Sequence, residues 1–257
     1  MATPRQLTMN AVPGIPLLAR GDDLGLIIIG AMQRAHLLLA DGDIIAIAQK
    51  VVSKAEGRFV ELGSIVPSSR ALQVAAKVSK DPRLVEVILS ESVRIVREQP
   101  GVLIVEHRDG FIMANAGVDR SNVSSDANGE MVLLLPRKPD ESARKLRAQF
   151  EEHSGKRLGV IISDSFGRPW RQGTVGIALG ASGVEALKNL RGQPDLFGRL
   201  LEVSETAHAD EIASAASLLM GQANEGHPVV IVSGLGTSER DLSAAALLRP
   251  ANQDLFR

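Results

Sequence analysis

Cysteine is absent from this chain of 257 residues, and aromatic residues make up only 3% of it. Without cysteine the chain has no disulfide framework, no thiolate metal site and no cysteine nucleophile. Any metal ion must therefore be held by oxygen atoms or by imidazole. The charges are also nearly balanced, with Lys+Arg 29 against Asp+Glu 30. We expect no nucleic-acid partner, because the chain lacks the basic field that attracts one.

A membrane-spanning run and an export signal are also missing. The longest apolar stretch near the start, residues 24–39, is interrupted by Gln33, Arg34 and His36. It falls short of the roughly 20 apolar residues that a membrane span requires. Residues 1–10 lack the apolar core and cleavage site of a secretory signal. We therefore expect a cytoplasmic protein that does not associate with membranes.

The pattern of apolar residues predicts a mixed fold. Hydrophobic residues make up 44% of the sequence, which is enough to form a sizeable core. The sequence predicts helices at residues 23–39, 67–79, 82–90, 140–153 and 209–220. It predicts strands at residues 44–48, 158–162, 174–179, 200–203 and 229–232, and a hairpin from residues 102–106 and 111–114. Because strands and helices do not alternate regularly, we expect one domain of α+β or irregular α/β class, which can divide into two lobes.

Neither of the two common nucleotide-binding motifs is present. The sequence has no GxxxxGK[ST] segment, and Gly234-Leu235-Gly236 is followed by Thr237-Ser238-Glu239, which does not complete GxGxxG. The histidines show no HxH or HExxH spacing, so we assign none of them to a metal. The phosphates of a bound nucleotide would have to meet lysines, backbone amides of turns, and metal ions held on carboxylates.

Two acidic segments follow predicted strands. Asp119 and Asn122 come just after the hairpin, and Asp164 and Ser165 come just after the strand at residues 158–162. Carboxylate, amide and hydroxyl oxygens are suitable ligands for Mg²⁺ or Mn²⁺, and a nearby arginine can grip a carboxylate or phosphate. The same residues are also typical of an Asx-turn or a helix N-cap, so the spacing leaves both interpretations open.

Two other segments carry groups suited to phosphate. Lys50 and Lys54 follow the strand at residues 44–48 and would share one face of a helical turn, although such a pair is also typical of a solvated basic face. A turn that begins at Gly221 lets backbone amides approach a phosphate, and Gln222 offers an oxygen to a metal. Gly221 is equally typical of a plain helix C-cap.

Five motifs, taken together and in order, resemble the coenzyme F420-0:L-glutamate ligase family. The resemblance extends from residue 13 to residue 234 and includes the similar stretches 175–180 and 195–199. The five motifs are Gly14-Ile15-Pro16-Leu17, Ala48-Gln49-Lys50-Val51-Val52-Ser53-Lys54-Ala55-Glu56-Gly57-Arg58, Asn115-Ala116-Gly117-Val118-Asp119-Arg120-Ser121-Asn122, Ser163-Asp164-Ser165-Phe166-Gly167-Arg168 and Leu218-Leu219-Met220-Gly221.

The resemblance implies a GTP-dependent ligase that adds L-glutamate to coenzyme F420-0, and a further γ-linked glutamate to F420-1, through an acyl phosphate. It also implies an intertwined α/β homodimer, unlike P-loop or Rossmann enzymes, with Mg²⁺ or Mn²⁺ at two sites and with K⁺. A nitroreductase-like C-terminal domain is not expected, because the chain ends at Arg257. Two alternatives stay open. One is a related metal-dependent ligase or phosphoryl or nucleotidyl transferase acting on another acid, and the other is a non-catalytic nucleotide-binding protein.

The resemblance also assigns roles by position. It implies metal ligands at Asp119, Asp164, Ser165 and Gln222, and catalytic roles for Lys50, Lys54 and Arg168. The residues implied around GTP are Ile15, Pro16, Leu17, Leu18, Gln49, Lys50, Lys54, Asn122, Ser217, Leu218, Leu219, Met220, Gly221, Gln222, Ala223 and Asn224. Ser165 stands where threonine is expected and Gln222 where an acid can occur, and a neutral Gln222 would weaken the second metal. For the homodimer, we expect the aliphatic runs at residues 26–29 and 132–135 to contribute to the contact between subunits.

Overall fold

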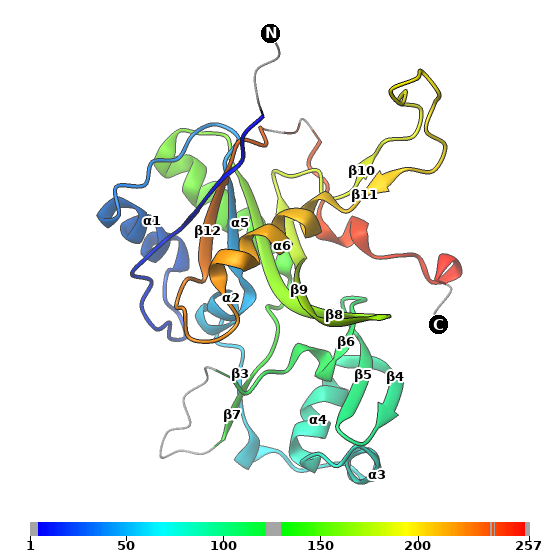
Figure 1. The fold of residues 1–257 in the computed structure, drawn as a ribbon. Coiled ribbons are helices and arrows are strands. Elements are labelled where there is room, and N and C mark those ends of the chain that lie inside the picture. Colours follow the sequence, from blue (N-terminus) through cyan, green and yellow to red (C-terminus); the bar gives the residue numbers. More distant parts are fainter. Residues whose placement is uncertain (1–4, 122–129, 237, 239, 255–257) are drawn as a thin grey trace.

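The computed structural model describes residues 5–121, 130–236, 238 and 240–254. The described chain has a larger lobe built on a five-stranded sheet and a smaller lobe built on a three-stranded sheet, with the smaller lobe below in Figure 1. Its α-helices are α1 (Leu24–Arg34), α2 (Gln49–Ala55), α3 (Ser69–Val78), α4 (Pro82–Ser90), α5 (Pro139–Ser154) and α6 (His208–Met220). The predicted mixed α/β class is confirmed. Among these residues, no helix is long and apolar enough to cross a bilayer.

The sheet of the larger lobe has the strand order β1-β12-β2-β8-β9. Its strands are β1 (Thr8–Ala11), β2 (Ile44–Ala48), β8 (Gly159–Arg168), β9 (Arg171–Ser182) and β12 (Val229–Ser233). Strands β2 and β8 run parallel, whereas the other neighbouring pairs are antiparallel. Because β2 lies at the centre and is buried on both faces, it is a continuous apolar run, which is why the sequence predicts it correctly.

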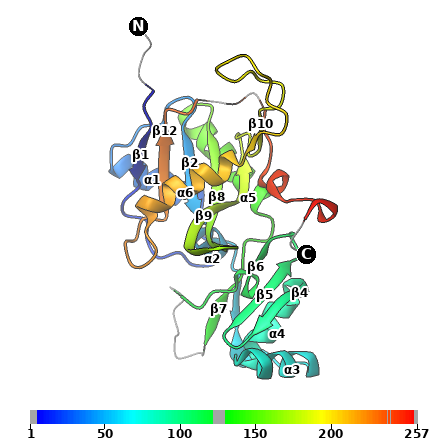
Figure 2. The same cartoon turned by 45° about the vertical axis from the view of Figure 1, so that its right-hand side comes forward.

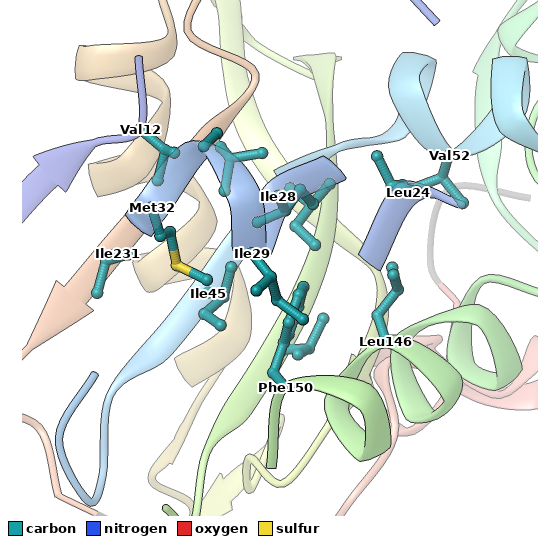
Figure 3. Close-up of a cluster of buried hydrophobic side chains, with 14 of the residues drawn as sticks. Val12, Leu24, Ile28, Ile29, Met32, Ile45, Val52, Leu146, Phe150 and Ile231 are labelled. Carbon is teal, nitrogen blue, oxygen red and sulfur yellow. The ribbon is translucent and has the colours of Figure 1, made fainter. Parts of the chain in front are cut away.

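Helices cover both faces of this sheet. Helices α1 and α5 pack on one face, where Ile28, Ile45 and Phe150 belong to a large buried cluster (Figure 3). Helix α6 lies across the other face with its alanines against the sheet. A side chain at Gly176 of β9 would collide with the backbone of Ala213, so this glycine lets α6 approach the sheet closely. The close packing fixes the position of the C-terminal end of α6.

The smaller lobe carries α3 and α4 on an antiparallel sheet, with a separate apolar core between them. Its strands are β4 (Ser92–Gln99), β5 (Val102–His107) and β6 (Ile112–Ala114). The predicted hairpin is confirmed as β5–β6, but the sequence did not predict β4. A short ribbon of β3 (Phe59–Glu61) and β7 (Met131–Leu133) connects this lobe to the larger one (Figure 1).

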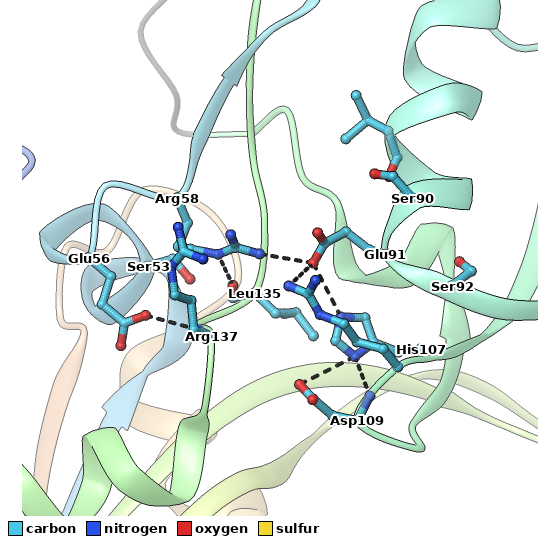
Figure 4. Close-up of polar contacts among 12 residues, drawn as sticks. Ser53, Glu56, Arg58, Ser90, Glu91, Ser92, His107, Asp109, Leu135 and Arg137 are labelled. Atoms are coloured by element: carbon cyan, nitrogen blue, oxygen red, sulfur yellow. Dashed lines mark hydrogen bonds and ion pairs between the residues drawn. The ribbon is translucent and has the colours of Figure 1, made fainter. Parts of the chain in front are cut away.

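Charged side chains, most of them buried, gather near the connection between the lobes, in a cluster that we call the joint (Figure 4). Arg58, which follows α2, donates hydrogen bonds to the Leu135 carbonyl at 2.8 Å and to Glu91 Oε2 at 2.9 Å. Arg108 contacts the same carboxylate at 2.7 Å, and His107 Nε2 lies 3.7 Å from it. Burial alone would raise the pKa of Glu91, but His107, Arg58 and Arg108 together hold it below its usual range.

An apolar contact supports the joint. Phe111 of the smaller lobe meets Phe166 of β8 edge to face, with ring centroids 6.2 Å apart. Both rings belong to one buried cluster that also includes Leu135 and Leu179. Charged and apolar contacts therefore hold the smaller lobe against the end of β8.

A long arm, residues 188–206, projects from the larger lobe on the side away from the smaller lobe (Figure 2). Its base is a pair of two-residue strands, β10 (Lys188–Asn189) and β11 (Glu205–Thr206). The strand predicted at residues 200–203 is wrong, because these apolar residues lie outside the short β10–β11 ladder and have little to pack against. Leu196 and Phe197 are 99% and 96% exposed, so no other described residue covers them.

Candidate functional site

Lys50, Asp119 and Asp164 lie near one another although they come from three separate parts of the chain. Lys50 lies in the first turn of α2, directly after β2, and Asp164 lies in β8. Ala48 pairs with Ser163 in the parallel ladder. Lys50 and Asp164, which follow them, therefore lie at the same edge of the sheet. Asp119 reaches this edge from the smaller lobe, and Lys50 Nζ lies 2.7 Å from its Oδ2 atom. We call these three residues the acidic centre.

A tight turn presents Asp119 to the acidic centre. Asn115 and Ala116 have left-handed φ angles of 54° and 52°, which few residues other than glycine adopt without strain. The chain then reverses, and Asp119 Oδ1 accepts a hydrogen bond from the Ser121 amide at 2.6 Å. This is the Asx-turn that was the alternative to metal binding. The second oxygen of Asp119 still faces Lys50, so the turn and a functional role are compatible.

Asp164 was expected to follow its strand in a loop, and this is wrong. Strand β8 continues to Arg168, because it pairs with β9 along residues whose polar character hides the strand pattern. Asp164 is therefore half-buried against the sheet. Burial, together with the negative charge of Asp119, raises the pKa of Asp164 to about 6, although the Ser165 amide and Lys50 act in the opposite direction. The ionised carboxylate is thus held in an unfavourable place, which a bound cation would relieve.

Asp119 behaves differently from Asp164. Burial alone would raise its pKa, but hydrogen bonds from Lys50 and from the Ser121 amide lower it below the usual range. At neutral pH Asp119 is therefore an anion that pairs with Lys50. The two carboxylates share one site, and their surroundings push their pKa values in opposite directions.

The two predicted lysines are not on a solvated basic face. Lys50 contacts Asp119 and donates a hydrogen bond to Ser121 Oγ at 2.6 Å. Lys54 lies one turn later in α2 and is half-buried, and its pKa is lowered first by burial and then by the charge of Lys50. Gln49 is buried, and its Oε1 atom accepts a hydrogen bond from Ser53 Oγ at 2.9 Å. Helix α2 thus directs two cations toward the region around Asp119.

The segment that follows α6 reaches the same edge of the sheet. Residues 217–220 form the last turn of α6, and Gly221 ends the helix with a φ of 71°, so the predicted C-cap is confirmed. Beyond it, Gln222 Oε1 accepts a hydrogen bond from Ser165 Oγ at 2.7 Å. Two of the four predicted metal ligands are therefore in direct contact. Ala223 and Asn224 continue this exposed turn.

The remaining residues predicted to surround GTP are residues 15–18 and Asn122. Residues 15–18 run between Val12, whose amide donates to the Val229 carbonyl, and Gly21, whose amide donates to Ala55 at the end of α2. They therefore pass beside the same edge of the sheet, with Leu18 buried and Leu17 fully exposed. Asn122 lies outside the described residues.

Arg168 is set apart from the two lysines. It lies four residues beyond Asp164 in β8, or about 13 Å at the usual rise of a strand. Among the described residues its Nη1 atom is buried and has no hydrogen-bond partner. The structure therefore separates Arg168 from Asp164 along β8 and leaves one of its buried donors without a partner among the described residues.

The oxygen atoms of this region fit a hard cation. In the described part of the chain, no group of three or more histidine or acidic side chains is arranged to hold a metal. Mg²⁺, however, usually takes only one or two protein carboxylates together with substrate phosphates and waters. Asp119 and Asp164 supply that number, and Ser165 and Gln222 add neutral oxygens. Lys50 now provides the positive charge beside Asp119 that a metal would otherwise supply.

Two features of the site were not predicted from the sequence. Ser121 bridges Asp119 and Lys50, and its only signal was its place two residues after the aspartate. The joint of Arg58, Glu91 and Arg108 was also missed, because its members are separated by long stretches of chain. Arg58 is the last residue of the motif that begins at Ala48, but no residue near it in the sequence indicated Glu91 as its partner.

The fold and the acidic centre together define a mixed α/β protein with a lysine-flanked carboxylate site and no P-loop. The chain matches the family model described as F420-0:Gamma-glutamyl ligase over residues 14–234. It is 46% identical over 253 residues to the coenzyme F420:L-glutamate ligase of Methanothermobacter thermautotrophicus, covering 98% of this chain and 99% of that protein. It is 47% identical over 223 residues to the protein of the same name from Methanocaldococcus jannaschii, covering 87% and 88%. The chain belongs to the F420-0:Gamma-glutamyl ligase family.

Proposed function

We propose that this protein is a coenzyme F420:L-glutamate ligase that uses GTP. The observation that carries the proposal is that Lys50, Asp119 and Asp164 lie near one another, within a chain that matches the family model over most of its length. Relatives that are 46% and 47% identical bear this name. The first product would be F420-1, and a second, γ-linked addition would extend it.

Amide formation from a carboxylate requires a leaving group. In the proposed reaction, a carboxylate oxygen of F420-0 attacks the γ-phosphorus of GTP, the bond to the β–γ bridging oxygen breaks, and GDP leaves. The amine nitrogen of L-glutamate then attacks the acyl carbon, the carbon–oxygen bond to phosphate breaks, and the nitrogen loses a proton. The products are the amide, GDP and phosphate, so no further reactant is needed.

The residues of the chain supply charge and position for these steps. Lys50 and Lys54 stabilise the transferring phosphoryl group, which is the main source of rate in phosphoryl transfer. Asp119, Asp164, Ser165 and Gln222 would hold Mg²⁺ or Mn²⁺, and bound divalent ions neutralise charge on the β- and γ-phosphates. Arg168 offers its free Nη1 donor to a carboxylate or phosphate of the deazaflavin substrate.

The nucleotide would lie against the larger lobe. Residues 15–18, helix α2 and the turn after α6 border one edge of the sheet, and the half-buried Lys54 lies among them. Backbone amides of the turn at Gly221 can meet phosphate oxygens. A monovalent ion such as K⁺ would add further positive charge near the phosphates.

We also propose a homodimer, but one of the two aliphatic runs that the sequence suggested for its interface, residues 132–135, does not fit. Residues 132–135 are buried inside the smaller lobe and the joint, so they are not available to a second subunit. The arm is better suited, because it exposes Leu196 and Phe197 almost fully and most of Val203. Exposed apolar side chains that lie together mark an interaction surface.

A single assay tests the ligase function. The purified protein is incubated with F420-0, L-glutamate, GTP and Mn²⁺. The products are then separated, and their masses are measured by mass spectrometry. The expected result is a deazaflavin one glutamyl residue heavier, formed with GTP and not with ATP. A different amide would favour a related ligase, and GTP binding without any product would favour a non-catalytic protein. Either outcome contradicts the proposal.

A further inference from the structure

A cavity of about 420 Å³ opens on the smaller-lobe side of Asp119. The turn between α3 and α4 forms one wall, and the turn that presents Asp119 forms the other. The lining residues are Ser79, Lys80, Asp81, Leu84, Asn115, Val118, Asp119 and Arg120. Asp119 thus belongs to both the acidic centre and this cavity, so a ligand in the cavity would lie next to the proposed site of phosphoryl transfer.

Lys80 is the unusual member of the cavity wall. It is half-buried, and within the described residues its ammonium group has no ion pair or hydrogen bond. The neighbouring charges are matched: Asp81 contacts Arg83 at 2.6 Å, and Arg120 contacts Glu130 at 2.6 Å. A half-buried cation that lines a cavity and lacks a counter-ion is suited to an anionic ligand.

The opposite wall of the cavity offers hydrogen-bond acceptors. Asn115 Oδ1 is buried and has no hydrogen-bond partner among the described residues, so it can accept a hydrogen bond from an N–H group. Asp119 places a carboxylate on the same wall. The cavity therefore presents the ammonium group of Lys80 on one wall and the oxygen acceptors of Asn115 and Asp119 on the other, which matches a small molecule that has both a carboxylate and an amine.

We propose that this cavity binds the incoming L-glutamate, with Lys80 holding a carboxylate and the amine directed toward Asn115 and Asp119. The inference rests on the proposed ligase function. The cavity volume lies near the lower end of the range for small-molecule sites, which suits an amino acid better than a deazaflavin. Lys50, which belongs to the elements proposed to bind GTP, contacts Asp119 from the larger lobe and does not line the cavity, so the cavity is left for a second reactant.

The test compares Lys80→Met with a matched control in the same lobe. Lys77→Met removes a lysine from α3 that is 62% exposed and pairs with Glu98, and it should behave as the wild type. Lys80→Met should raise the KM for L-glutamate about tenfold or more, while the KM values for F420-0 and GTP stay within twofold. Lys80→Arg should restore much of the loss, because it returns the positive charge.

Direct binding separates this inference from the ligase function itself. Saturation-transfer NMR with L-glutamate should show binding to the wild-type protein and to Lys77→Met, and little or none to Lys80→Met. If the wild type forms the amide but Lys80→Met keeps its glutamate KM and NMR signal, the cavity assignment is wrong and the ligase function stands. A rise in the KM for F420-0 or GTP in place of glutamate would also overturn it. If the wild type neither binds nor ligates glutamate, both proposals fail.

Discussion

The raised pKa of Asp164 predicts that this carboxylate destabilises the metal-free protein. Burial is the main cause of the shift from 3.8 to about 6, and the charge of Asp119 adds to it. A group whose pKa is higher in the folded state holds its proton more tightly there. The stability that this tighter proton binding contributes is therefore complete below the pKa of the unfolded state and is lost as the pH rises through the pKa of the folded state. At neutral pH ionised Asp164 opposes folding, so Asp164→Asn should be more stable than the wild type.

The size of this effect can be worked out from the pKa values. A difference between 3.8 and about 6 corresponds to about 3 kcal/mol of unfolding free energy when the carboxylate is fully ionised. Asp164 is only half-buried, and water screens part of its charge. We therefore expect Asp164→Asn to gain about 1–2 kcal/mol at about pH 7.5, and only a few tenths near pH 4.

Urea unfolding followed by circular dichroism, in the presence of EDTA, measures this gain. Glu152→Gln on the exposed face of α5 serves as the control, because it also removes one negative charge. The same Asp164→Asn protein should have lost its ligase activity, so a residue that destabilises the fold would be retained for its chemistry. Equal or lower stability of Asp164→Asn at pH 7.5, or a gain that persists near pH 4, would refute the reasoning.

The remaining predictions concern the acidic centre, the nucleotide, the joint and the arm. Asp119→Asn should lower the ligation rate about a hundredfold or more in the mass-spectrometric assay, and wild-type turnover would exclude a catalytic role. Lys54→Ala should weaken GTP binding by about 1.5–3 kcal/mol in calorimetry, which an unchanged dissociation constant would contradict. Glu91→Gln should lower the unfolding free energy by about 3 kcal/mol in urea, because Arg58 loses a buried partner, whereas a loss below about 1 kcal/mol would argue against the joint. Phe197→Asp should convert a dimer into a monomer of 27.3 kDa by light scattering, and a monomeric wild type would disprove the dimer.

Elements with a strong local pattern were predictable from the sequence. Strand β2, the β5–β6 hairpin and helices α4, α5 and α6 lie where apolar periodicity and turn residues placed them. Strand β4 and the second half of β8 were missed, because their polar residues carry no alternating pattern. Their strand conformation depends on pairing with β5 and β9, which local sequence does not encode.

The composition of the site was predictable, but its geometry was not. Motif resemblance identified Lys50, Asp119 and Asp164 individually, and spacing alone left each of them with an ordinary structural explanation. Lys50 and Ser121 are 71 residues apart, so their hydrogen bond depends on how the smaller lobe docks. The opposite pKa shifts of the two aspartates likewise arise from burial and from partners that only the folded chain brings together.

The position of the acidic centre between the lobes divides the proposed reaction between them. The larger lobe supplies Lys50, Lys54 and Asp164, and the smaller lobe supplies Asp119 together with the proposed glutamate cavity. An amine must come within about 3–3.5 Å of the acyl carbon before it can attack. The joint and the contact between Phe111 and Phe166 fix the smaller lobe against β8, so they also fix that approach. Glu91→Gln should accordingly lower kcat even where the variant is fully folded, while its affinity for GTP, which we propose to bind against the larger lobe, should not change.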